Sequence, residues 1–183
     1  MIGVSKHTGG GNFKPAPAGT KVLTLVDVVD LGEVETSYGP KEKLKFTYQT
    51  EDTFEKDGDT LNYHVMQRYN KSMFKEGAKI STLRAAIEAL LRRSVLASDY
   101  DSDGKFDVEK LIGMSAMGNI VQTDPKPDGT VYSNISTIMA LPTGTPPVKI
   151  NSSFVRKKYQ PESGQQDRNK WAASQQTEDE IPF

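Results

Sequence analysis

Cationic and tyrosine side chains recur together in two neighbouring segments of the chain, 38–48 and 63–75. Cations spaced in this way can follow the phosphates of a nucleic acid, and aromatic rings between them can stack on its bases. We therefore treat these side chains, together with one lysine further along the chain, as candidate nucleic-acid contacts. The candidates are Tyr38, Lys43, Lys45, Tyr48, Tyr63, Arg68, Tyr69, Lys71, Lys75 and Lys126. Each strand tyrosine has a second interpretation, because such a ring is often buried in the core.

The last six residues form a second candidate site of a different chemical kind. Three acidic residues lead into an apolar tip that carries the terminal carboxylate, and the preceding residues 151–177 are rich in Gln, Ser, Asn and Lys. A segment of that composition buries too little apolar surface to fold, so we expect a flexible tether. Charges, an anchoring side chain and a carboxylate together are typical of a docking peptide. The partner-binding candidates are Glu178, Asp179, Glu180, Ile181, Pro182 and Phe183.

The tip resembles the C-terminus of bacterial single-stranded DNA-binding proteins, in which an acidic run ends in Ile-Pro-Phe. Bacteriophage single-stranded DNA-binding proteins are similar, with an acidic tail and a terminal aromatic residue. The close resemblance covers residues 178–183 only. It implies that the tip recruits proteins of DNA replication, repair and recombination.

Composition excludes several other classes of protein. The chain has 183 residues, a formal net charge of -1 and no cysteine, which rules out disulfides, a thiol nucleophile and cysteine-based zinc sites. No nucleotide-binding or hydrolase motif is present, and His7 and His64 stand apart in an arm and a strand. We expect no enzyme and no cofactor. Without a long apolar run or a signal-peptide pattern, we expect a cytoplasmic protein that does not bind membranes, in a bacterial host if it is phage-encoded.

An acidic loop has part of the spacing of a calcium site. Asp99, Asp101 and Asp103 stand at the first, third and fifth positions of such a loop, and Gly104 follows. The twelfth position should be a bidentate glutamate, but it is Lys110. We therefore interpret the loop as an acidic surface turn and expect no metal.

Five strands and one helix are expected to position these candidates. Strands are predicted at 22–29, 43–49, 61–69, 114–122 and 131–140, with a helix at 81–95 and a short helical turn at 108–112. Three strands, a helix and two strands is the element order of the OB-fold, a five-stranded Greek-key barrel, although other α+β arrangements share this order. In strand 43–49, Leu44, Phe46 and Tyr48 should lie on one face and the lysines on the other.

We divide the chain into four parts. They are a flexible N-terminal arm at 1–19, an OB-fold nucleic-acid-binding domain at 20–142, a disordered polar linker at 143–177 and an acidic protein-docking tip at 178–183. Arg68 and Tyr69 must point to opposite faces of a regular strand, so only one of them can share a face with Lys43 and Lys45.

The function expected is sequence-independent binding of single-stranded DNA. Two alternatives fit the same features. One is an OB-fold adaptor that binds only proteins, which the near-neutral charge favours. The other is a single-strand annealing protein.

Overall fold

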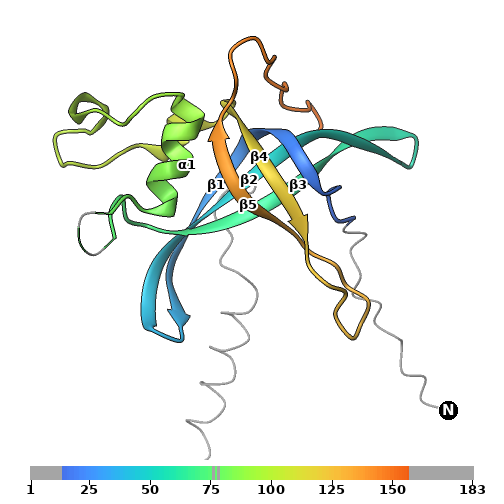
Figure 1. Ribbon diagram of the computed structural model, residues 1–183, viewed down its shortest axis with the longest axis horizontal. Coiled ribbons are helices and arrows are strands. Elements are labelled where there is room, and N and C mark those ends of the chain that lie inside the picture. Colours follow the sequence, from blue (N-terminus) through green and yellow to red (C-terminus); the bar gives the residue numbers. More distant parts are fainter. Residues whose placement is uncertain (1–13, 76, 78, 157–183) are drawn as a thin grey trace, which may run out of the picture.

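The computed structural model describes residues 14–75, 77 and 79–156, and it is mainly β with one α-helix (Figure 1). The predicted tip at 178–183, most of the predicted linker and residues 1–13 of the predicted arm lie outside the described residues. The strands are β1 (Gly19–Thr36), β2 (Gly39–Lys56), β3 (Asp59–Asn70), β4 (Ser115–Gln122) and β5 (Ser133–Ala140). Helix α1 (Thr82–Leu91) and the short 3-10 helices η2 (Ala97–Asp99) and η3 (Val108–Leu111) lie between β3 and β4.

All five strands form one antiparallel sheet with the order β3-β2-β1-β4-β5. Strand β1 is central and pairs with both β2 and β4. The β1–β2 and β2–β3 hairpins extend outward from the body of the sheet (Figure 1). The edge strands β3 and β5 approach each other, but no strand pairing joins them, so this sheet is not closed into the predicted barrel.

The prediction of five strands and one helix in this order is confirmed, and the boundaries differ. Strands β1 and β2 each run for 18 residues because their hairpin continues to a tight turn at 37–38. Ser81 caps α1 by accepting a hydrogen bond from the Arg84 amide at 3.1 Å. The helix ends at Leu91 and not at 95, because Arg92 adopts a left-handed conformation with φ of 57° that stops the helical path.

The core lies between α1 and one face of the sheet. The predicted alternation in β2 is confirmed, since Leu44, Phe46 and Tyr48 are buried there and Lys43 and Lys45 are half-exposed on the other face. From α1, Leu83, Ile87 and Leu90 pack against the same cluster, as the helical spacing of apolar residues predicts. Burial of these side chains is the main force that holds the helix on the sheet.

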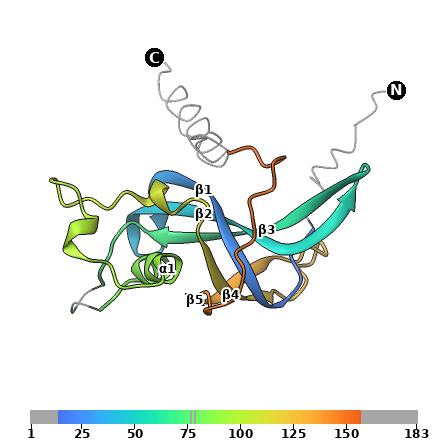
Figure 2. The ribbon, with the colours of Figure 1, turned by 90° about the horizontal axis from the view of Figure 1, so that it is seen from above.

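Residues 148–156, which we name the strap, cross the opposite face of the sheet from α1 (Figure 2). Disorder was expected from residue 143, but these residues have specific partners. The Thr24 hydroxyl donates to the Val148 carbonyl at 2.6 Å, and the Gln49 amide donates to the Lys149 carbonyl at 2.8 Å. The ordered domain therefore extends beyond the predicted boundary at 142, to residue 156 of the described chain.

The other predicted boundary, at residue 19, also lies inside the ordered part. Ala16 is completely buried, and its carbonyl accepts hydrogen bonds from Gln122 and Ser133, both at 2.9 Å. Among the described helices, none is long and apolar enough to span a membrane.

The buried hydroxyls of Tyr48 and Tyr69 allow the contribution of a core hydrogen bond to stability to be tested. They lie 3.2 Å apart and bond to each other, and burial raises the pKa of both, that of Tyr48 the more strongly. Tyr48→Phe should lower the free energy of unfolding by about 1–3 kcal/mol, because it leaves the Tyr69 hydroxyl without its partner. The double change to phenylalanine should cost less than the two single changes added together, as measured by urea denaturation. Additive costs would show that this hydroxyl pair does not act as a unit.

Candidate nucleic-acid interface

Strand register decides which candidate cations share a surface. Lys45 lies opposite Arg68 in the β2–β3 pair and opposite Val29 in the β1–β2 pair, and Lys43 lies opposite Asn70. Directly paired residues project to the same side of a sheet. We name the side opposite α1 the outer face. Its members on β1, β2 and β3 include Thr24, Asp27, Val29, Lys43, Lys45, Thr47, Gln49, His64, Met66 and Arg68.

Two predicted stacking residues lie on the wrong face. Tyr48 is completely buried and Tyr69 is 4% exposed, and the Tyr69 ring packs edge-on against Phe46 with a centroid distance of 5.1 Å. Their rings belong to the core beneath α1, so no base can reach them. The predictions for Tyr48 and Tyr69 are therefore corrected, and the conflict between Arg68 and Tyr69 is decided in favour of Arg68. The physical reason is the two-residue period of β2 and β3, which assigns every second side chain to the core.

The other two tyrosines lie at separate places. Tyr63 is half-buried and packs against the Phe54 ring with a centroid distance of 4.7 Å, in the outer part of the β2–β3 hairpin. Tyr38 is 89% exposed at the turn between β1 and β2. Of the four predicted tyrosines, Tyr38 is therefore the one that presents a free aromatic surface, and it lies at the end of a long hairpin.

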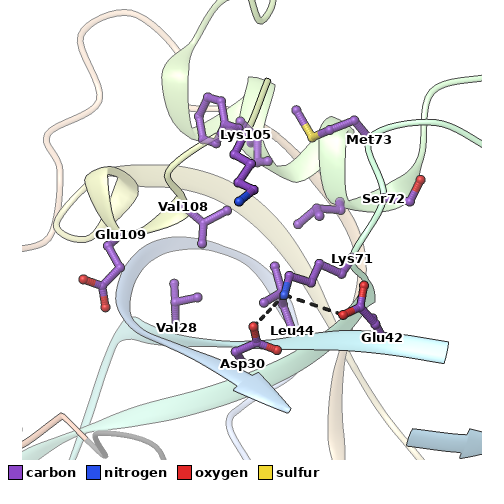
Figure 3. Close-up of a pocket in the computed structure, with 13 residues that line it drawn as sticks. Val28, Asp30, Glu42, Leu44, Lys71, Ser72, Met73, Lys105, Val108 and Glu109 are labelled. Atoms are coloured by element: carbon purple, nitrogen blue, oxygen red, sulfur yellow. Dashed lines mark hydrogen bonds and ion pairs between the residues drawn. The ribbon is translucent and has the colours of Figure 1, made fainter. Parts of the chain in front are cut away.

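Lys71 belongs to a different cavity (Figure 3). Its ammonium group lies 2.7 Å from Asp30 and 4.0 Å from Glu42. The hydrogen bond between Lys71 and Asp30 raises the pKa of the lysine and lowers that of the carboxyl. This cavity, of about 380 Å³, lies between the core face of the sheet, α1 and residues 105–109. Lys75 lies in the exposed loop before α1, so neither lysine joins Lys43 and Lys45 on the outer face.

Lys126 lies in the loop between β4 and β5, with its ammonium group 4.5 Å from the centre of the Tyr132 ring. Lys126 and Tyr132 line a shallow hollow of about 320 Å³ together with Met66. Met66 is directly opposite Thr47, so this loop meets the outer face at β3. Lys43, Lys45, Arg68 and Lys126 are the predicted cations that the fold brings to one connected region.

Sequence reasoning missed the residues that the strap adds to this region. The Phe154 ring stacks on His64 with a centroid distance of 5.0 Å and an interplanar angle of 29°. The Arg156 guanidinium lies 3.0 Å from Asp27 and 2.7 Å from Glu109. The only signal in the sequence was a short apolar and basic pattern, with Ile150, Phe154 and Val155 set in an otherwise polar segment.

His64 is the titratable group at the centre of this region. Burial lowers its pKa, while a hydrogen bond with the Asn62 backbone acts in the opposite direction. Its Nε2 atom is buried and has no hydrogen-bond partner within the part of the chain that the structure describes. The imidazole is therefore neutral near pH 7, and it offers its ring face to Phe154 without adding a cation to the surface.

The acidic loop that resembles a calcium site uses its carboxylates locally. Both Asp99 oxygens accept hydrogen bonds from Arg93 at 2.7 Å, and this lowers the Asp99 pKa to about 2. Asp101 accepts from the backbone amides of Asp103 and Lys105. Within residues 14–75, 77 and 79–156, no group of three or more His, Asp or Glu side chains is placed to hold a metal ion.

Comparison with known proteins gives no family for this chain. No protein-family model matches it, and no curated protein matches it significantly. The physical evidence on function is therefore the geometry described above.

The lowered pKa of His64 predicts how stability depends on pH. Below its ordinary pKa of 6.5, the unfolded chain takes up a proton at this position before the folded chain does. Proton uptake then favours the unfolded state, so the free energy of unfolding should fall as the pH drops from about 7 to about 5. His64→Gln should reduce this fall, as measured by thermal unfolding at each pH. His7 is present in both proteins and cancels in the comparison; the same pH dependence in both would contradict the prediction.

Proposed function

We propose that this protein binds single-stranded DNA without sequence preference, through an OB-type sheet. An OB-fold is a partly open five-stranded Greek-key barrel. The arrangement here supports it, because β1 pairs with both β2 and β4, β5 approaches β3, and α1 connects β3 to β4. OB-folds bind strands on the face of β2 and β3 and at the loops after β1 and β4.

The observation that carries the proposal is the register of β2 and β3. It brings Lys43, Lys45 and Arg68 to the outer face, and the same alternation places Tyr48 and Tyr69 in the core. Lys43 and Lys45 have no ion-pair partner among the described side chains, so their charges are available to phosphates. The β4–β5 loop adds Lys126 and Tyr132 beside the same strands.

Binding without sequence preference follows from the kind of contact. Cations that touch phosphates fix the position of a strand but do not read its bases. Amide side chains can read base edges, yet the carboxamide of Gln49 is already bonded on both sides to the strap. The outer face therefore combines charge and apolar surface, which suits stacking and phosphate contact.

The tip at 178–183 is assigned a separate role within this proposal. Its acidic run and apolar anchors support recruitment of replication, repair or recombination proteins. Its negative charge opposes that of DNA, so it is suited to bind a protein partner or to compete with DNA for the cations.

A protein-binding adaptor is the second candidate, favoured by the cavity in Figure 3. Its floor is apolar, with Val28, Leu44, Leu83 and Ile87, and it has room for a partner's side chain. A titration with oligo-dT at two salt concentrations separates the two functions, since an adaptor gives no salt-dependent binding. An annealing-rate assay with complementary strands separates simple binding from single-strand annealing.

Removal of two outer-face lysines tests the proposed surface. Each lost phosphate contact should reduce the slope of log affinity against log salt by about 0.7 for a single strand. Lys43→Ala combined with Lys45→Ala should therefore weaken oligo-dT binding and reduce the slope by about 1.4. Fluorescence anisotropy of a labelled oligonucleotide at several salt concentrations gives both quantities.

The matched control removes two positive charges elsewhere. Lys110 lies in η3 and Lys105 precedes it; both are exposed and neither belongs to β1, β2 or β3, so their change to alanine should leave the slope nearly unchanged. Equal effects of the two double variants would mean that only net charge matters. That result would contradict phosphate contact at Lys43 and Lys45.

Deletion of residues 178–183 tests the role of the tip. The thermal unfolding of the body should be unchanged, because the core that the structure describes is formed by residues outside 178–183. Capture of purified replication or repair proteins should be lost, because the acidic run and Phe183 are removed together. Affinity for oligo-dT should increase modestly at low salt and less at high salt, since screening weakens the competition. Undiminished capture by the shortened chain would exclude the docking role.

A further inference from the structure

A narrow cavity of about 260 Å³ lies between the strap and the outer face. One side is formed by Phe154 and Val155 of the strap. The other side is formed by strands β1 to β3. The lining residues on these strands are Asp27, Val29, Lys45, Thr47, His64 and Met66. We name this cavity the slot. It combines one available cation, aromatic rings and apolar surface within a single concave site.

The strap is held in place on the strand side by the carboxamide of Gln49. Its amide nitrogen donates to the Lys149 carbonyl and its oxygen accepts from the Asn151 amide, both at 2.8 Å. Gln49 is completely buried, although it belongs to the outer face. Asn151 also donates to the Asn62 side chain at 3.1 Å. These bonds hold the start of the strap against β2 and β3.

The end of the strap is anchored by charge. Arg156 bridges Asp27, which is 3% exposed, and Glu109 beside it. Phe154 lies between the two anchors and stacks on His64. Its ring is therefore fixed at one wall of the slot, and a stacking partner can bind there without first ordering the side chain.

We propose that the slot holds one nucleotide of the bound strand, with its base against Phe154 and Met66 and its phosphate at Lys45. This inference rests on the proposed function and adds residues of the strap to the binding surface. Met66 also lines the hollow that contains Lys126 and Tyr132. A strand that leaves the slot across Met66 therefore meets a second cation and a second aromatic ring.

In the alternative arrangement, the strap covers the outer face and DNA displaces it on binding. Displacement would break the Gln49 bonds and would separate Arg156 from Asp27. It would also uncover the Asp27 carboxylate beneath the incoming phosphates, which is unfavourable. Binding with the strap in place avoids these costs, because Arg156 stays paired with Asp27.

The test uses the full-length chain, labelled oligo-dT and Phe154→Ala. Loss of the stacking ring should weaken binding by about 5- to 150-fold. Phe154→Tyr should restore most of the affinity, because it keeps an aromatic face. The matched control is Phe74→Ala, which removes an equally large and half-exposed ring from the loop before α1, and it should bind as the unchanged protein does. Thermal unfolding shows whether each variant is folded.

A second measurement reports directly on the slot and does not depend on loss of affinity. Trp171 is the only tryptophan, so Trp171→Phe with Phe154→Trp places a single tryptophan in the slot. Oligo-dT should quench its emission without a shift to longer wavelength, because a base stacks on the ring while the strap stays in place. A shift to longer wavelength would mean that the strap has been displaced into solvent.

The outcomes separate this inference from the proposed function. If the unchanged protein binds oligo-dT and Phe154→Ala binds equally well or more tightly, the slot is overturned and the proposed function stands. If the unchanged protein does not bind oligo-dT at any salt concentration, the proposed function fails and the slot fails with it. The slot and the proposed function are both supported if Phe154→Ala weakens binding while Phe74→Ala does not. Phe154→Tyr should then restore the affinity, and oligo-dT should quench the tryptophan placed in the slot.

Discussion

Strand β2 packs Leu44, Phe46 and Tyr48 against α1, and this packing sets the direction of every other side chain along the strand. Because side chains alternate along a strand, Lys43 and Lys45 must then face outward. A shift of one residue would bury the two lysine charges and expose the large side chains of Leu44, Phe46 and Tyr48. Both changes would strongly destabilise the folded state. The core thus determines the charge of the opposite surface, and pairing with β1 and β3 extends that surface across three strands.

The centre of β1 shows that the sheet is covered on both sides. All residues from 22 to 29 are buried, which a two-layer structure of helix and sheet would not explain. The strap supplies the third layer, and its backbone and side chains satisfy Thr24, Gln49 and Asp27. Buried polar groups without partners are costly, so the strap is part of the folded domain and not an appendage. A binding surface on this side of the sheet is consequently built partly from the strap.

Charge is separated locally in a chain that is almost neutral overall. Asp30 and Glu42 gather around Lys71 at the cavity next to α1, and Asp27 lies under Arg156. These pairs neutralise acidic groups near the sheet, while Lys43 and Lys45 keep their charge available on the outer face. Net charge is therefore a poor guide to nucleic-acid binding for this chain, because local arrangement determines the potential that a strand meets. The His64 ring contributes aromatic surface there without charge, since burial lowers its pKa.

The sequence by itself determined the elements, because the period of apolar residues is a local property. The alternation in β2 and the helical spacing of Ile87 and Leu90 both predict what the structure contains. Only the tertiary structure decided which candidates meet, since register and face depend on pairing between distant segments. It separated Lys71 from Lys45, and it placed Tyr69 in the core and Arg68 on the face of Lys45, a choice that the sequence left open. It also brought the strap to His64 and Gln49, about a hundred residues earlier in the chain, through contacts that no local pattern encodes.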